Sequence, residues 1–130
     1  MITVLANGCF DPLHPGHVAH LQEAATFGDR LIVALTLDEH VNKGPKRPYL
    51  TWAERFGMLR ELRCVDEVYP SANAWEAIRL YRPEVFVKGE DWRDRLPAET
   101  LEACVEVGAE IRFTETPRFG TAEMVRRLSR

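Results

Sequence analysis

The stretch that decides the fold reads Val4-Leu5-Ala6-Asn7-Gly8-Cys9-Phe10-Asp11-Pro12-Leu13-His14-Pro15-Gly16-His17. An apolar run enters a turn that is punctuated by Gly and Pro, and the turn ends with two histidines beside a helix start. A helix N-terminus carries roughly half a positive elementary charge and unpaired backbone N–H groups, so a phosphate placed there is held before any side chain is counted. The stretch therefore predicts phosphate binding, with two imidazoles placed to neutralise charge that develops on a phosphorus centre.

Outward from this stretch, apolar runs alternate with segments of helical period. Strands are predicted near residues 2–6, 31–35, 67–69, 85–87 and 111–113. Helices between them show apolar stripes and end signals: Gly28 stops the first, Thr51 with Glu54 begins the second, and Gly108 stops the helix over residues 98–107. A last helix is expected after Gly120, with Thr121 as its cap.

The run over residues 31–35 is apolar without alternation, which indicates a strand that is buried on both faces. A doubly wound parallel sheet with helices on each side explains that pattern, so we expect an α/β fold with five strands. With 130 residues, of which 45% are hydrophobic, residues 1–130 fit one domain.

Charge and cysteine content narrow the function classes. The net charge of −3 argues against a broad nucleic-acid surface, so no nucleic-acid partner is expected. Three cysteines at wide spacing, with no Cys-x-x-Cys, suggest neither a disulfide framework nor a cysteine zinc site. The chain shows no signal-peptide pattern, and no stretch approaches the ~18 apolar residues of a membrane span. We therefore expect a cytoplasmic protein without a membrane partner.

Polar clusters follow four of the predicted strands, over residues 7–17, 38–47, 88–92 and 117–121. Ligands of doubly wound sheets bind beyond the carboxyl ends of the strands, near the point where the strand order switches. The four clusters are therefore expected to converge on one site.

These residues resemble the cytidylyltransferase-like nucleotidyltransferases, a family with a Rossmann-like fold that is marked by His-x-Gly-His after the first strand. Residues 8–17 are similar to that signature, and residues 31–38 are similar to the second strand and its following Asp. Residues 43–48 with Glu54-Arg55 resemble the Lys-Gly…Arg-Pro…Glu-Arg run of heptose-1-phosphate adenylyltransferases. Residues 87–92 resemble the Lys-Gly-x-Asp-aromatic run of those enzymes and, more loosely, its counterpart in glycerol-3-phosphate cytidylyltransferases.

The resemblance implies an enzyme that transfers a nucleoside monophosphate from a nucleoside triphosphate, with ATP favoured over CTP, to a phosphorylated sugar or polyol. Examples of the acceptor are a heptose 1-phosphate and glycerol 3-phosphate, and pyrophosphate is released. Such transfers depend on alignment and on stabilisation of developing charge. The cationic groups that the resemblance assigns to catalysis are His14, His17, Lys43 and Lys46.

The same resemblance assigns the binding residues. Those expected to contact the nucleotide are Gly8, Cys9, Phe10, Gly16, Arg55, Lys88, Gly89, Asp91, Trp92 and Thr121. Asp11 and Asp38 are expected to orient a base or an acceptor hydroxyl. A Mg²⁺ ion is expected on the triphosphate, with its protein ligands unassigned. A homodimer is also expected.

Plainer interpretations compete with these assignments. His14, His17 and His20 have a spacing at which imidazoles share a zinc ion, although Gly16 favours anion binding. His20 and His40 are interpreted as residues without a role in the chemistry. Where the family usually carries a Ser-Thr-Thr cluster, residues 119–122 read Phe-Gly-Thr-Ala, which keeps one hydroxyl. This departure motivates the alternative of a catalytically weak nucleotide- or metal-binding regulatory domain.

Overall fold

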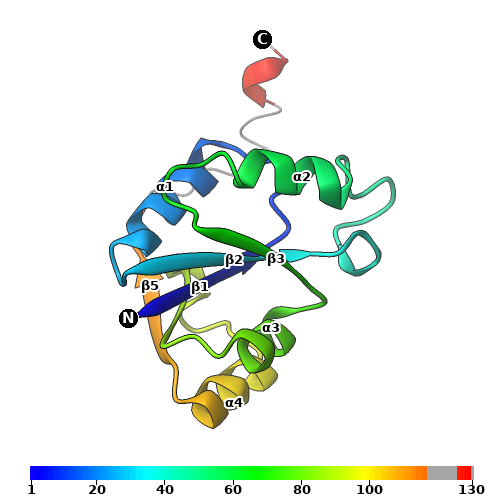
Figure 1. Cartoon of the computed structure of the whole chain (residues 1–130). Coiled ribbons are helices and arrows are strands. Elements are labelled where there is room, and N and C mark those ends of the chain that lie inside the picture. The colour runs from blue at the N-terminus through cyan, green and yellow to red at the C-terminus, as the bar shows by residue number, and fades with distance from the viewer. Residues whose placement is uncertain (117–125, 130) are drawn as a thin grey trace.

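The computed structural model describes residues 1–116 and 126–129. Strands and helices alternate along the described chain (Figure 1). Their bounds are β1 Thr3–Gly8, α1 Pro15–Ala25, β2 Arg30–Thr36, η1 Asp38–His40, α2 Trp52–Leu59, β3 Glu67–Ser71, α3 Ala74–Tyr81, β4 Val85–Gly89, η2 Glu90–Trp92, α4 Ala98–Val107 and β5 Glu110–Thr114. The predicted strands and the helix over residues 98–107 are therefore confirmed. The helix expected after Gly120 lies outside the described residues.

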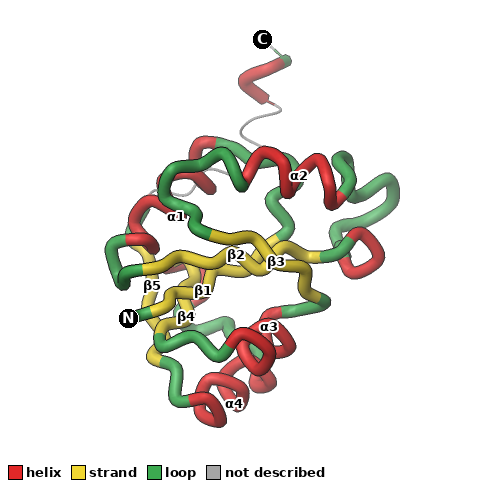
Figure 2. The backbone as a smooth tube through the Cα atoms, in the orientation of Figure 1, coloured by secondary structure: helices red, strands yellow, loops and turns green. Residues whose placement is uncertain are grey.

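The five strands form one sheet in the order β3-β2-β1-β4-β5, and every neighbouring pair is parallel. Helices α1 and α2 cover one face of this sheet and α3 and α4 cover the other (Figures 1 and 2). The expected doubly wound α/β fold is thus confirmed. Chain order reverses between β1 and β4, so the switch point lies beyond the carboxyl ends of these two central strands.

Alternating residues of the central strands supply two cores. Val4 and Ala6 of β1 pack toward α1 and α2, whereas Leu5 packs toward α3 and α4. Side chains of a strand point to opposite faces in turn, so a central strand must be apolar throughout to fill both cores. This requirement explains the uninterrupted apolar run of β2, where Leu31 and Ile32 belong to different cores.

The start of α2 and the end of α4 follow the local signals in the sequence, whereas α1 ends at Ala25, with Thr26 as its C-cap, before the stop expected at Gly28. Thr51 accepts a hydrogen bond from the Glu54 amide, and the Glu54 carboxylate accepts one from the Thr51 amide, which completes the expected capping box of α2. Gly108, with φ of 74°, ends α4 in the left-handed conformation that glycine adopts most easily.

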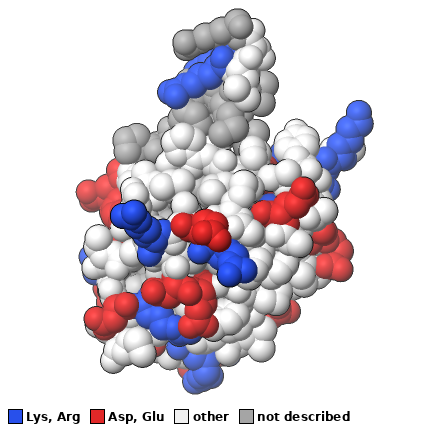
Figure 3. All heavy atoms as spheres, turned by 45° about the horizontal axis from the view of Figure 1, so that its top comes forward, with Lys and Arg blue, Asp and Glu red and all other residues white. Residues whose placement is uncertain are grey.

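Two surface properties of the described residues bear on function. No helix among them has both the length and the apolar character needed to span a membrane. On the face shown in Figure 3, acidic and basic side chains are interspersed, and neither sign forms a continuous patch there.

Candidate active site

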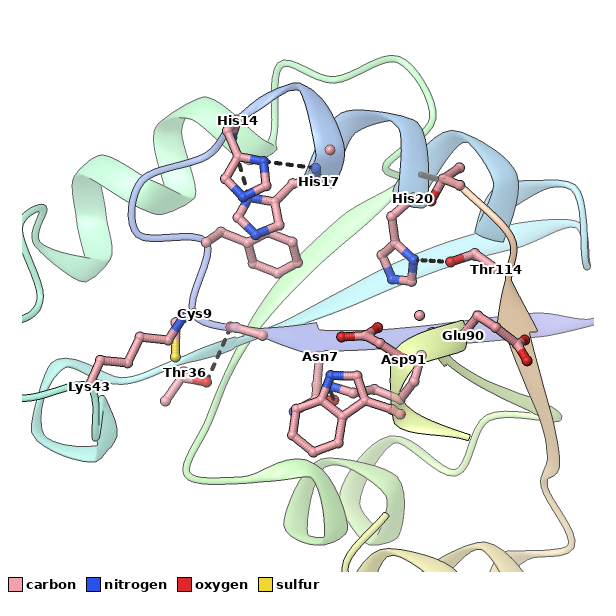
Figure 4. A pocket seen from close by; sticks show the side chains of 17 residues that line it. Asn7, Cys9, His14, His17, His20, Thr36, Lys43, Glu90, Asp91 and Thr114 are labelled. Carbon is pink, nitrogen blue, oxygen red and sulfur yellow. Dashed lines mark hydrogen bonds between the residues drawn. The ribbon is translucent and has the colours of Figure 1, made fainter. Parts of the chain in front are cut away.

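A pocket of about 690 Å³ opens at the carboxyl edge of the sheet, at the switch point between β1 and β4 (Figure 4). Eleven of the residues expected to carry the site line it, namely Gly8, Cys9, Phe10, His14, Gly16, His17, Lys43, Lys88, Gly89, Asp91 and Trp92. They come from the turn after β1, the start of α1, the loop after β2 and the segment after β4. The tertiary fold therefore joins three of the four predicted strand-end clusters, and the fourth, over residues 117–121, lies outside the described residues.

His14 and His17 form a reciprocal cap at the start of α1. The Nδ1 atom of His14 accepts the His17 amide at 3.3 Å, and the Nδ1 atom of His17 accepts the His14 amide at the same distance. The two rings stack with centroids 3.6 Å apart and an interplanar angle of 19°. Because each Nδ1 must offer a lone pair to an amide, each ring carries its proton on Nε2. The pair thus presents two Nε2–H donors at a helix N-terminus.

Burial keeps these rings uncharged. It lowers the pKa of His17 to about 3, and the neighbouring groups His14, Lys43 and His20 lower it further because their protonated forms repel a charged His17 ring. Burial, followed by the Lys43 charge, also lowers the pKa of His14. At neutral pH the pair therefore consists of neutral hydrogen-bond donors, which agrees with the protonation that the cap requires.

The Phe10 ring packs against the His17 ring of this pair. It meets the His17 ring edge-on with centroids 4.9 Å apart, and it is almost completely buried. A Cβ atom on Gly8 would lie 3.0 Å from the Phe10 ring, so the absence of a side chain at Gly8 makes room for this support.

Two lysines bring positive charge to the pocket. Lys43 extends into it from the loop after β2 (Figure 4). At the end of β4, the Lys88 ammonium donates to Asn7 Oδ1 at 3.4 Å and lies 4.8 Å from the Trp92 ring centroid. Burial lowers the pKa of Lys88 to about 8, so this ammonium is still charged at neutral pH.

His20, which sequence reasoning set aside, lies in this pocket. Its Nδ1 atom is 2.6 Å from Thr114 Oγ1 at the end of β5, and burial lowers its pKa to about 4. The signal that could have found it was its spacing, because it follows His17 by three residues and so lies on the same helix face. The other pocket residues missed from the sequence are Asn7, Thr36, Glu90, Thr114 and Thr116. All of them lie within two residues of the carboxyl end of a strand.

Arg55 occupies a different place from the one expected, since its side chain is fully buried below the pocket and does not line it. Its guanidinium donates to the carbonyls of Leu50, Cys9 and Thr36 at 2.8–3.1 Å and to Asp38 Oδ1 at 2.6 Å. These acceptors use four of the five N–H donors of the guanidinium. Arg55 thus ties the ends of β1 and β2 to the loop before α2 and does not lie among the pocket-lining residues with which it was grouped.

Asp11 also lies outside the pocket lining. Its buried carboxylate accepts hydrogen bonds from the Tyr49 amide at 2.7 Å, the Leu50 amide at 2.9 Å and Arg47 Nε at 3.0 Å. Burial pushes its pKa up, but these donors outweigh it and the pKa lies below its usual value. Asp11 therefore fastens residues 47–50 to the turn after β1 and does not line the pocket that an acceptor would enter.

Asp38 and Lys46 also lie away from the pocket lining. The Asp38 carboxylate pairs with Arg55 and is 47% exposed. Lys46 is exposed in the loop after β2 and has a φ of 66°. Of the two lysines assigned to catalysis, the structure brings Lys43 alone to the pocket. Thr121 lies outside the described residues.

The geometry also bears on the zinc hypothesis. The Nδ1 atoms of His14 and His17 accept backbone amides, and that of His20 contacts Thr114. Among residues 1–116 and 126–129, no three His, Cys, Asp or Glu side chains are grouped to hold a metal ion. The described site therefore gives the zinc hypothesis no support.

A parallel α/β sheet whose switch point holds a helix N-terminus, two imidazole donors and two lysines belongs to the doubly wound class and offers the donors and positive charge that a phosphate-bearing ligand requires. Comparison with known proteins agrees with this. The family model described as cytidylyltransferase-like matches residues 5–119. The chain belongs to the cytidylyltransferase-like family.

Individual relatives are similar over most of this chain. The "Bifunctional protein HldE" of Chromohalobacter salexigens is 44% identical over 113 residues, which is 84% of this chain and 24% of the relative. The protein of the same description from Methylococcus capsulatus is 40% identical over 116 residues, covering 86% of this chain and 24% of the relative. This chain thus spans about a quarter of the length of these curated relatives.

Solved structures show the same fold. A lipopolysaccharide core biosynthesis protein from Thermoplasma volcanium aligns with a TM-score of 0.73 and 24% identity, over 92% of this chain and 99% of that one. A bifunctional NMN adenylyltransferase/ADP ribose pyrophosphatase from Francisella tularensis aligns with a TM-score of 0.65 and 14% identity, over 98% of this chain and 41% of that one.

Proposed function

We propose that this chain transfers a nucleoside monophosphate, with ATP favoured over CTP as donor, to a phosphorylated sugar or polyol and releases pyrophosphate. The observation that carries the proposal is the stacked pair of His14 and His17 at the N-terminus of α1, with both rings in the switch-point pocket. The pair and the helix end supply hydrogen-bond donors where an α-phosphate would lie, and Lys43 adds positive charge beside them.

The reaction joins an acceptor phosphate oxygen to the α-phosphorus and breaks the bond from that phosphorus to the bridging oxygen of pyrophosphate. A phosphate monoester is largely dianionic at neutral pH, because its second pKa is about 6. The attacking oxygen therefore arrives without a proton, and no general base is required. Neutral His14 and His17 fit this chemistry, since their Nε2–H groups donate to phosphate oxygens as charge develops. Lys43 would stabilise the departing pyrophosphate.

The choice of substrates within this proposal rests on sequence. Residues 43–55 resemble the corresponding run of heptose-1-phosphate adenylyltransferases, which supports ATP as donor and a heptose 1-phosphate as acceptor. The looser resemblance of residues 87–92 keeps glycerol 3-phosphate as the other acceptor class.

The proposal includes Mg²⁺ carried by the triphosphate. Mg²⁺ keeps several waters and binds through substrate phosphates with one or two carboxylates. The described pocket offers one carboxylate for that mode, because Asp91 lies in its lining, whereas both carboxylate oxygens of Glu90 accept hydrogen bonds from Arg93. When bound, the ion would neutralise part of the charge on the phosphate oxygens.

A homodimer is part of the same proposal. Large apolar side chains are exposed on the helices of one sheet face, namely Leu80 of α3 and Leu101 and Val105 of α4. Burying them against a second copy would remove apolar area from water.

Pyrophosphate release tests the transfer directly. The purified protein is incubated with Mg²⁺, ATP or CTP, and a panel of sugar 1-phosphates and polyol phosphates, and pyrophosphate is measured with a coupled assay. We expect release with ATP and a heptose 1-phosphate, and none when the acceptor is omitted. A protein that binds nucleotide yet releases no pyrophosphate with any pair would instead be the regulatory domain considered above.

Nucleotide preference has its own measurement. A ligand that binds the folded state alone raises the free energy of unfolding by about 2.7 kcal/mol at a hundred times its Kd. With equal concentrations of ATP and CTP, we expect ATP to give the larger rise in melting temperature. A larger rise with CTP would reverse the proposed donor.

A further inference from the structure

His20 lies one turn of α1 beyond the histidine pair. Three residues separate it from His17, which places it about 4.5 Å further along the helix axis. Figure 4 shows its ring directed into the pocket, above Asp91 and beside Thr114 at the end of β5. Helix α1 thus carries its histidines from the end of β1 toward the end of β5.

Thr114 fixes the orientation of this ring. Its Oγ1 atom lies 2.6 Å from His20 Nδ1, which leaves the Nε2 edge of the ring for other partners. Within residues 1–116 and 126–129, Nε2 makes no hydrogen bond. The ring is neutral at pH 7, because its pKa is lowered by burial first and by the Lys88 charge second. Nε2 is therefore a donor in one tautomer and an acceptor in the other.

A hydroxyl group matches this edge in either tautomer, because a hydroxyl both donates and accepts hydrogen bonds. A phosphate oxygen that is ionised can only accept, so it suits one tautomer. The Asp91 carboxylate, which also lines the pocket, favours a group with an O–H or N–H to donate, although the Lys88 ammonium acts on His20 in the opposite sense.

The order of groups along a nucleotide then identifies the hydroxyl. If the α-phosphate lies at the His14–His17 cap, the β- and γ-phosphates extend toward the positive charge of Lys43. The group attached on the other side of the α-phosphate is the ribose, separated by one oxygen and one methylene. It extends toward the part of the pocket that holds His20 and Asp91 (Figure 4).

We infer that His20, oriented by Thr114, binds a ribose hydroxyl of the nucleotide and makes the site selective for ribonucleotides. This inference rests on the proposed function in one respect, which is that the ligand is a nucleoside triphosphate. It does not require the transfer step, because the contact forms on binding.

The experiment distinguishes the role of Nδ1 of His20, which contacts Thr114, from the role of Nε2, which is proposed to contact the ribose. In a His20→Asn variant, the amide oxygen or nitrogen occupies the place of Nδ1, so the Thr114 contact is kept and Nε2 is lost. In a His20→Gln variant, the amide end occupies the place of Nε2 and the Thr114 contact is lost. His40→Asn is the matched control, since His40 is exposed and does not line the pocket.

Dissociation constants of ATP, 2′-deoxy-ATP and 3′-deoxy-ATP are measured by calorimetry without acceptor, with the corresponding CTP set alongside. We expect the unmodified protein to bind one deoxy analogue about threefold to tenfold more weakly than the ribonucleotide. His20→Asn should bind all three within about twofold, because its affinity for the ribonucleotide falls. His20→Gln should keep part of the preference, and His40→Asn should keep all of it.

Equal binding of the three nucleotides by the unmodified protein would overturn the inference, as would full preference in a folded His20→Asn variant. If that variant does not fold, the unmodified protein and His20→Gln decide the question. Retained ribose selectivity without pyrophosphate release would contradict the transfer alone, whereas failure of every triphosphate to bind would contradict both.

Discussion

Replacing His17 with asparagine should lower kcat for pyrophosphate release by about 10²–10³-fold, with little change in stability. The asparagine side chain can still accept the His14 amide in place of Nδ1, so the cap of α1 is kept. It cannot reach the position of Nε2, which is the donor that we assign to the α-phosphate. The loss should fall mainly on kcat, because a donor aimed at developing charge contributes most in the transition state.

The alanine variant and a distant histidine complete this test. His17→Ala removes both nitrogens and should match the kinetic loss while costing about 1 kcal/mol more in the free energy of unfolding, the usual value of a cap. His40→Asn should leave kcat unchanged. A His17→Asn enzyme that turns over at the normal rate would remove Nε2 of His17 from the mechanism.

Replacing Arg55 with methionine should lower the free energy of unfolding by about 3–5 kcal/mol. The change leaves the carbonyls of Leu50, Cys9 and Thr36 without their donor, and it leaves Asp38 without its partner. Since a domain of this kind is stable by only about 5–15 kcal/mol, urea denaturation should show a much lower midpoint. Arg55→Lys should recover little, because one ammonium cannot reach acceptors on several segments.

Arg60, the residue directly after the end of α2, offers the matched control. Its side chain is 61% exposed and lies 4.0 Å from Glu61, so Arg60→Met should change the free energy of unfolding by no more than about 0.5 kcal/mol. The comparison also decides between the two roles considered for Arg55. An Arg55→Met protein of normal stability that binds ATP weakly would restore the anion-binding role expected from the sequence.

Local patterns in the sequence were enough to predict most of the secondary structure. The capping pair of Thr51 and Glu54, the stop at Gly108 and the unbroken apolar run of β2 each depend on neighbours within a few residues or on burial of a whole strand. Signals of this kind are visible without the fold, because their energies arise from the backbone and the solvent. The same reasoning placed the polar clusters at one edge of the sheet.

Charged residues near that edge could not be sorted by pattern. Lys43 and Lys46 lie in the same loop and carry the same positive charge, yet of the two only Lys43 lines the pocket. Arg55 and Asp11 have the residue types of ligand-binding groups, but their partners lie 17 to 46 and 36 to 39 residues away in sequence, apart from the Leu50 carbonyl beside Arg55. The Arg55 side chain is 0% exposed, so its polar atoms must find hydrogen-bond partners within the protein. Such complete burial arises only when the whole fold is assembled.

The sequence by itself determined the parallel α/β sheet, the edge at which a ligand binds and the histidine pair at the head of α1, since each follows from short-range periodicity, capping and chain order. Tertiary structure decided which polar groups face the ligand and which support the backbone. It placed Arg55 and Asp11 where they bind backbone groups of the loops, and it brought His20 to the end of β5 beside Thr114. The physical reason is that hydrogen-bond partners are chosen by proximity in space, which chain distance does not fix until the strands have paired.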